Sequence, residues 1–103
     1  KLISKSVISS MKKSSYLINV SRGTVIDEKA LINSLKNNKI KGAALDVFFN
    51  EPKINPIFKK LNNVILHPHH GSGTIETRNA MAQLSCMNLI NFFKKGKPLH
   101  KVI

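Results

Sequence analysis

The sequence predicts an α/β fold in which parallel strands alternate with helices. Three short apolar runs, at residues 16–20, 42–48 and 64–66, have the length and composition of buried strands. Two other segments, from Asp27 to about residue 38 and from residue 74 to 95, have the apolar spacing of amphipathic helices. Strands joined through helices or long crossovers run parallel, so we expect a parallel sheet followed by a long C-terminal helix.

Local signals support each element in turn. Residues 4–11 have the pattern of the tail of a helix, and the segment 21–23 interrupts the chain after the first strand. Asp27 is a typical N-cap, and Leu31 and Leu35 are four residues apart on one face of the helix that follows. We expect that helix to end near residue 38.

Prolines and a glycine define the second half of the chain. Pro52 and Pro56 indicate a loop after the second strand, because a residue before proline is kept out of the helical region. Gly96 and Pro98 end the long helix, and Cys86 lies inside it, where packing is a more ordinary role than chemistry. The apolar positions expected on this helix are Ala80, Leu84, Met87, Leu89, Ile90 and Phe93.

The composition excludes several classes of protein. The chain of 103 residues has 42% hydrophobic and 21% charged residues, which is the balance of a globular domain. No apolar run approaches the roughly 18 residues of a membrane span, and the start of the chain has no signal-peptide pattern. The single cysteine excludes an internal disulfide framework, so we expect a reducing, cytoplasmic compartment.

The net charge of +12 suits an anionic partner, such as nucleic acid, a phosphate-bearing cofactor or an acidic membrane surface. The lysines, however, are dispersed in small groups beside the expected element ends, where they offset helix dipoles or cover a solvated face. Five Phe, one Tyr and no Trp provide no stacking platform for bases. Nucleic-acid binding is therefore the less favoured interpretation.

Polar side chains follow each of the three expected strands. Arg22 follows the first, Asp46 and Glu51 follow the second, and His69 follows the third. Ligands of parallel sheets bind at this carboxyl edge. A Glu51 carboxylate on one ring nitrogen of His69 would fix the imidazole, leaving the other nitrogen to give or take a proton, and Arg22 would hold a carboxylate. The pattern predicts proton transfer on a small carboxylate-bearing molecule, although loops are polar in any case and chance grouping stays open.

The segment from His67 to Gly73 contains three histidines and two glycines. A metal site is not favoured, because alternate residues point to opposite sides, Pro68 stiffens the segment and no cysteine or acid is close in sequence. The glycines resemble half of a dinucleotide fingerprint, but Glu76 stands where the third glycine would be and would repel a pyrophosphate. Small residues here would instead let a flat ligand approach the backbone.

Three motifs in order make the chain resemble the C-terminal part of the D-isomer-specific 2-hydroxyacid dehydrogenases. Residues 11–27 (MKKSSYLINVSRGTVID) are similar to one long block of that family. Residues 44–52 (ALDVF, then EP) and residues 68–78 (PHHGSGT, then ETR) are similar to two more. Residues 42–44, the Gly71–Ser72 pair and residues 96–99 resemble the glyoxylate/hydroxypyruvate reductase branch of the family most. His70 departs from the pattern by standing where the family usually has an apolar residue, and His67 stands where Thr or an apolar residue is common.

The resemblance implies reduction of a small 2-oxo acid, such as glyoxylate or hydroxypyruvate, to the 2-hydroxy acid by hydride transfer from NAD(H) or NADP(H). It makes Arg22 the anchor of the substrate carboxylate, His69 the general acid, and Glu51 the residue that orients His69. Asp46, with the backbone around Val20, would anchor the nicotinamide carboxamide. The residues implied at the cofactor are Val20, Ser21, Asp46, Gly71 and Ser72.

The resemblance also implies a domain organisation. Residues 1–73 would be the C-terminal half of a Rossmann-like NAD(P)-binding domain, and residues 74–103 a long helix and tail that would cross to a substrate domain. The chain contains no GxGxxG turn for a pyrophosphate. We therefore expect a fragment that is inactive alone, from a protein that is a homodimer at full length.

Two other interpretations stay open. The charge would suit a non-catalytic, dinucleotide-sensing or nucleic-acid-associated binding module, and the chain could also be a degenerate fragment without function. The joint presence of Arg22, Glu51 and His69 favours catalysis, because a binding module needs no acid with an orienting carboxylate.

Overall fold

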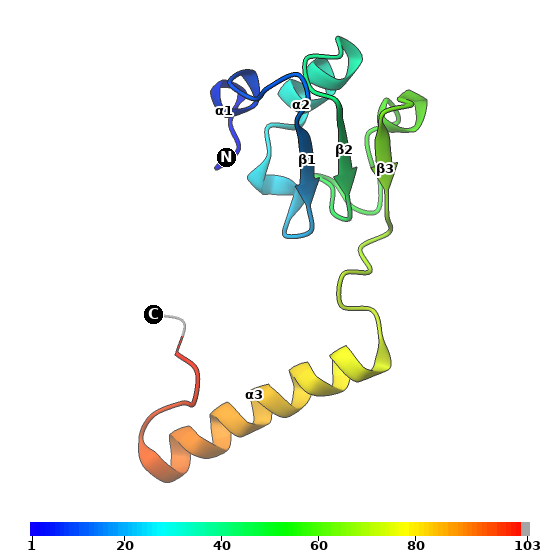
Figure 1. Cartoon of the computed structure of the whole chain (residues 1–103). Helices are drawn as coiled ribbons and strands as arrows, with labels where there is room; N and C mark the ends of the chain where they lie inside the picture. The colour runs from blue at the N-terminus through cyan, green and yellow to red at the C-terminus, as the bar shows by residue number, and fades with distance from the viewer. Residues whose placement is uncertain (102–103) are drawn as a thin grey trace. The chain divides into compact units, whose positions relative to one another are not determined.

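The computed structural model describes residues 1–101, which fall into two compact units, Lys1–Gly71 and a second unit that begins at Ser72 (Figure 1). The first unit contains a sheet of three parallel strands in the order β1 (Tyr16–Asn19), β2 (Gly42–Leu45) and β3 (Val64–Leu66). The second contains one long helix, α3 (Ile75–Lys95). The predicted α/β class, with a parallel sheet and a long C-terminal helix, is confirmed.

The first unit has two helices, α1 (Lys5–Ser9) and α2 (Glu28–Lys36), and two short 3-10 turns, η1 (Gly23–Val25) and η2 (Phe58–Lys60). Helix α2 begins where the capping signal places it, because the carboxylate of Asp27 accepts a hydrogen bond from the backbone N–H of Ala30 at 3.0 Å. Residues 4–11, expected as a helix tail, instead contain the complete short helix α1. The Ser4 hydroxyl caps it by accepting from the N–H of Val7.

The core lies between one face of the sheet and the helices. Leu31 and Leu35 of α2 are each 1% exposed, as their spacing predicts, and burial of such a side chain contributes about 1.5–3 kcal/mol. Along β1 the side chains alternate, so that Leu17 is buried while Tyr16 and Ile18 are exposed. The buried cluster comprises Ile8, Leu17, Ile26, Leu31, Ile32, Leu35, Ile40, Ala43, Leu45, Phe48 and Phe58.

The first two strands are shorter than predicted. Strand β2 ends at Leu45, not at residue 48, and β1 ends one residue before the predicted Val20. Beyond β2, the N–H of His67 still donates to the carbonyl of Leu45 at 2.9 Å, but the next residue is Pro68, which has no N–H to continue the ladder. The apolar run therefore passes from a strand into a loop while its side chains stay buried.

Helix α3 has the predicted ends. The hydroxyl of Thr74 accepts from the N–H of Thr77 at 3.2 Å, and Gly96 closes the helix in the left-handed conformation at φ 71°. No residue of α3 is buried among the described residues, and all six of its expected apolar positions are exposed. Packing was the role expected for Cys86, and its exposure corrects that expectation. Within residues 1–101, no helix has the length and apolar character that membrane crossing requires.

Candidate active site

The three strands of the first unit end at the same edge of the sheet (Figure 1). Arg22 lies in the loop that leaves β1, Asp46 and Glu51 lie in the loop that leaves β2, and His69 lies in the loop that leaves β3. The chemical groups that the sequence places at one edge therefore come from three loops of one compact unit.

Glu51 and His69 form a hydrogen-bonded pair. The Nδ1–H of His69 donates to Oε2 of Glu51 at 2.7 Å, and the backbone N–H of Phe48 donates to Oε1 at 2.7 Å. Both carboxylate oxygens are therefore fixed, and the hydrogen bond leaves Nε2 of the imidazole free for chemistry. The two side chains are 46% and 34% exposed, so the pair is open to a ligand.

The pKa of Glu51 is lowered from its ordinary value. The largest cause is the hydrogen bond from His69, followed by the bond from the N–H of Phe48. The positive charge of Arg22 also lowers this pKa, by less than either hydrogen bond does. Glu51 is thus held as a carboxylate, the form that accepts a hydrogen bond from the imidazole of His69.

The backbone of His69 is in the left-handed conformation, at φ 57°. Histidine is among the side chains found there more often than most, but the conformation costs roughly 1–2 kcal/mol for a residue with a Cβ. The contacts of neighbouring residues must hold this turn.

Asp46 supplies these contacts. Its carboxylate is 6% exposed and accepts three hydrogen bonds, from Nδ1 of His67 at 2.6 Å, the N–H of His70 at 2.8 Å and the N–H of Gly71 at 2.8 Å. The bond from His67 is the largest cause of a lowered pKa, about 2, and the two backbone bonds add to it; burial acts in the opposite direction. The first two donors fill Oδ1, whereas Oδ2 accepts one bond and keeps room for another.

Sequence reasoning missed the Asp46–His67 pair. The signal was present, because His67 directly follows β3 and Asp46 directly follows the neighbouring strand β2. The same edge argument that joined Glu51 to His69 applies to this pair. From the sequence, by contrast, His67 was interpreted only as a metal-ligand candidate and as a departure from the family pattern.

A buried asparagine shapes the turn that carries Arg22. Asn19, 5% exposed, accepts on Oδ1 from the N–H and the hydroxyl of Ser21, and its Nδ2 donates to the carbonyl of Arg22 at 3.0 Å. The Arg22 guanidinium itself is exposed and bonds the carbonyl of Ser21 at 2.6 Å. Asn19 was also missed, although a polar residue at the last buried position of a strand is a usable signal for such a turn.

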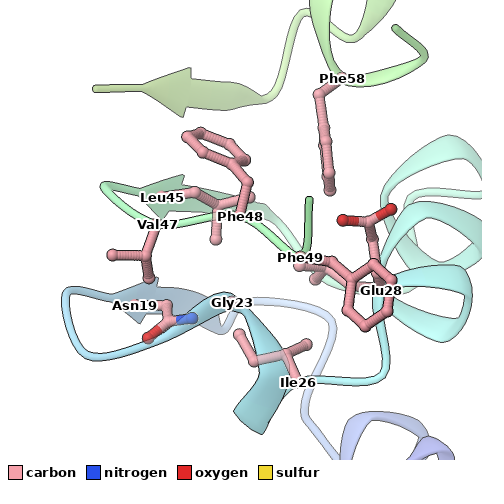
Figure 2. Close-up of a pocket in the computed structure, with 10 residues that line it drawn as sticks. Asn19, Gly23, Ile26, Glu28, Leu45, Val47, Phe48, Phe49 and Phe58 are labelled. Atoms are coloured by element: carbon pink, nitrogen blue, oxygen red, sulfur yellow. The ribbon is translucent and has the colours of Figure 1, made fainter. Parts of the chain in front are cut away.

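Gly23 lets the loop after β1 approach the loop after β2. A Cβ on this residue would overlap the backbone of Phe48 and Phe49. Figure 2 shows Gly23 beside this segment, with Ile26 and Phe58 among the surrounding side chains. The hollow between them has only about 10 Å³, which is room for at most one water molecule, so this region is packing and not a ligand site.

A larger hollow lies beside the His69–Glu51 pair. It is open to solvent and has a volume of about 430 Å³, which is within the size range of small-molecule sites. Its walls are mostly apolar, with two imidazoles, one carboxylate and one lysine as polar groups. The lining residues are Phe48, Glu51, Pro52, Ile54, Lys59, Leu66, His67, Pro68 and His69.

The remaining predicted positions lie at the same edge or in the second unit. Val20 is 68% exposed at the end of β1, next to Ser21. Gly71 closes the loop on Asp46, whereas Ser72 begins the second unit, which is described by itself. Residues 1–101 contain no group of three His, Cys, Asp or Glu side chains placed to hold a metal ion.

A parallel sheet whose strands end at one edge is typical of the α/β domains that bind nucleotide cofactors. The family model described as D-isomer specific 2-hydroxyacid dehydrogenase, NAD binding domain, matches residues 1–71. This chain belongs to that family.

Particular relatives are similar over nearly the whole chain. The chain is 45% identical over 102 residues to a 2-ketogluconate reductase from Gluconobacter oxydans, covering 99% of this chain and 33% of that protein. Two solved structures are also similar. One is an NADPH-dependent glyoxylate/hydroxypyruvate reductase from Sinorhizobium meliloti in complex with NADP and malonate, with a TM-score of 0.83 and 42% identity over 97% of this chain and 31% of that one. The other is a glyoxylate reductase from Paecilomyes thermophila, with a TM-score of 0.87 and 36% identity over 98% of this chain and 31% of that one. The chain thus spans about a third of the length of these relatives.

Proposed function

We propose that this chain supplies one wall of the active site of an NAD(P)H-dependent reductase that converts a small 2-oxo acid of the glyoxylate or hydroxypyruvate type into the 2-hydroxy acid. The observation that carries the proposal is the Glu51–His69 pair, at 2.7 Å, on the sheet edge that also carries Arg22. An imidazole with one nitrogen fixed by a carboxylate and the other free is suited to proton transfer at neutral pH.

The residues at this edge fit the nicotinamide end of the cofactor. Oδ2 of Asp46 keeps an acceptor position, which suits the amino group of a carboxamide. Gly71 presents no side chain beside that oxygen, where a Cβ would stand at 3.0 Å, and Val20 offers an exposed apolar surface. We assign Val20, Ser21, Asp46, Gly71 and Ser72 to the cofactor, which when bound supplies the hydride.

Three side chains would act on the 2-oxo acid. The guanidinium of Arg22 binds the carboxylate through its planar fork of donors. As hydride adds to the carbonyl carbon, the C=O electron pair moves onto oxygen, and Nε2–H of His69 donates its proton there. Glu51 keeps Nδ1–H in place and stabilises the positive imidazole before that transfer. In the reverse direction, the neutral Nε2 takes the proton from the hydroxyl group.

Several broader properties belong to the same proposal. We assign residues 1–73 to the cofactor domain, and residues 74–103 to a segment that crosses to a substrate domain. The chain covers about a third of its relatives, so we expect no turnover from the chain alone. Homodimer formation at full length and a cytoplasmic location stay predictions.

The test is a chimera in which this chain replaces the matching segment of the Gluconobacter 2-ketogluconate reductase. Loss of NADH or NADPH absorbance is followed with glyoxylate, hydroxypyruvate and 2-ketogluconate. We expect reduction by the chimera and none by the 103-residue chain. A folded chimera that binds cofactor but reduces none of the three acids contradicts the proposal, as does turnover by the chain alone.

A further inference from the structure

The carboxylate of Asp46 is bonded on both sides of His69 in the sequence. The ring of His67, two residues before, donates to Oδ1 at 2.6 Å. The N–H groups of His70 and Gly71, directly after, donate to Oδ1 and Oδ2 at 2.8 Å each. The left-handed backbone of His69 lies between these two attachments.

We propose that His67 is a positioning residue for His69, and that it acts through Asp46. A left-handed backbone at a residue with a side chain persists where its surroundings over-determine it. The two backbone bonds to Asp46 hold the far side of the turn. On the near side, the backbone N–H of His67 donates to the carbonyl of Leu45 at 2.9 Å, and the next residue, Pro68, has no N–H to donate. The imidazole of His67 is the side-chain contact that attaches the near side to the same carboxylate.

The chemistry of the pair supports this role. The His67 side chain is 57% exposed, whereas the Asp46 side chain is 7% exposed and anchored beside the carboxyl end of β2. The backbone N–H of Asp46 donates to the backbone carbonyl of Asn19 at 3.0 Å, so the backbone that carries the carboxylate is fixed to the end of β1. The bond between His67 and Asp46 therefore fixes the loop after β3 relative to the carboxyl end of β2.

The bond also determines which acceptor position Asp46 offers. Because His67 and His70 together fill Oδ1, the remaining position is on Oδ2, beside Gly71. Loss of the His67 ring would free one acceptor position on Oδ1. Asp46 would then offer a ligand two positions, one on each oxygen, and would no longer direct it to Oδ2 alone. The role of His69 in turnover rests on the proposed function, whereas the positioning of the loop does not.

The experiment compares three variants, studied both in the 103-residue chain and in the chimera. His67→Ala removes the donor. His67→Asn keeps an amide N–H near the place of Nδ1, so it can donate to Asp46. His70→Ala tests the edge-on contact between the His70 and His67 rings, whose centroids lie 5.5 Å apart, because it removes that contact while keeping the backbone N–H that bonds Asp46.

Three readouts separate positioning from a general loss of stability. They are the carboxyl titration of Asp46 by NMR, the ring-nitrogen signals of His69, and the kcat and KM of the chimera. We expect His67→Ala to move the pKa of Asp46 from about 2 towards 3.8 and to weaken the His69–Glu51 bond. It should lower kcat by about tenfold, a typical effect of losing a group that orients a catalytic residue, with KM for the 2-oxo acid changed less than about twofold. His67→Asn should restore most of each change, and His70→Ala should move the pKa of Asp46 less than His67→Ala does.

The inference is overturned if His67→Ala leaves both the His69 signals and kcat unchanged, or if folded His67→Asn restores none of the readouts. Should His67→Ala fail to fold, the wild-type titration decides, because a folded chain in which Asp46 titrates near 3.8 has no such pair. A wild-type chimera without reductase activity would defeat the proposed function, but the Asp46 titration and the His69 signals would still judge the role of His67.

Discussion

Two carboxylate–imidazole pairs join the loop after β2 to the loop after β3, and their carboxylates differ in burial. Asp46–His67 and Glu51–His69 have nearly equal bonds, 2.6 Å and 2.7 Å. The Asp46 side chain is 7% exposed and accepts three hydrogen bonds, whereas the Glu51 side chain is 34% exposed and accepts two. The same kind of pair can therefore fix the backbone of residues 67–71 through Asp46 and present an accessible imidazole at His69.

The difference supports the roles that we propose for the two pairs. A carboxylate whose acceptor positions are largely filled by its own chain contributes mainly to structure, and Asp46 attaches the end of β2 to residues 67–71. The Glu51–His69 pair borders an open hollow, and the charge of Arg22 acts on it. We expect substitutions of the Glu51–His69 pair to affect turnover more than stability, and substitution of Asp46 to lower stability as well as cofactor binding.

The largest effect is expected from His69→Gln in the chimera. Glutamine keeps an amide donor but cannot exchange a proton, so kcat should fall by about 100- to 10,000-fold. The dissociation constant for NADPH, measured by its fluorescence, should stay within a few fold. Unchanged glyoxylate reduction would place the proton donor elsewhere and remove the distinction between the two pairs.

The next largest effect is expected from Arg22→Ala. Hydrogen bonds to charged groups contribute about 1.5–3 kcal/mol, so kcat/KM should fall by roughly 10- to 100-fold, with KM raised and kcat lowered. Steady-state kinetics with glyoxylate measures both constants. Arg22→Lys is the matched control, because it keeps the charge without the planar fork and should lie between wild type and Arg22→Ala. An unaltered KM in Arg22→Ala would show that the carboxylate binds elsewhere.

A smaller effect, on stability, is expected from Gly23→Ala. The added Cβ would overlap the backbone of Phe48 and Phe49, so the loops after β1 and β2 must separate at a cost of about 1–3 kcal/mol. Urea unfolding of the 103-residue chain measures this change. Thr24→Ala, at an exposed neighbour in the same turn, should change stability by less than about 0.5 kcal/mol. Equal stability of the two variants would mean that the loops approach each other less closely.

The elements were predictable where local rules dominate. The Asp27 cap, the Leu31–Leu35 spacing and the Gly96 stop depend on neighbours in sequence, and each fixes an element end or a buried face. The end of β2 was mispredicted, because apolar character reports burial, whereas a strand ends where its partner stops pairing. That partner, β3, stops before Pro68, a feature of a different segment.

Topology predicted which side chains of the site share one edge of the sheet, but not how they bond to one another. Parallel strands bring Arg22, Glu51 and His69 to one edge, but which carboxylate bonds which imidazole depends on side-chain directions in irregular loops. Topology also brings Asp46 and His67 to this edge, but the bond between them and the left-handed backbone of His69 depend on those side-chain and loop directions. Periodicity carries no information about either.

The smallest effect is expected in the pH dependence of stability, and it tests the comparison directly. The pKa of Asp46 falls from 3.8 to about 2 on folding, so its contribution to stability is present in full above the higher value and is lost as the pH falls towards 2. The pKa of Glu51 is lowered as well, but this carboxylate is more exposed and solvent screens its interactions. Between about pH 2 and 5, Asp46→Asn should therefore flatten the decline of the thermal midpoint more than Glu51→Gln does. A larger flattening by Glu51→Gln would reverse the assignment, because the exposed pair would then be the one that stabilises the fold.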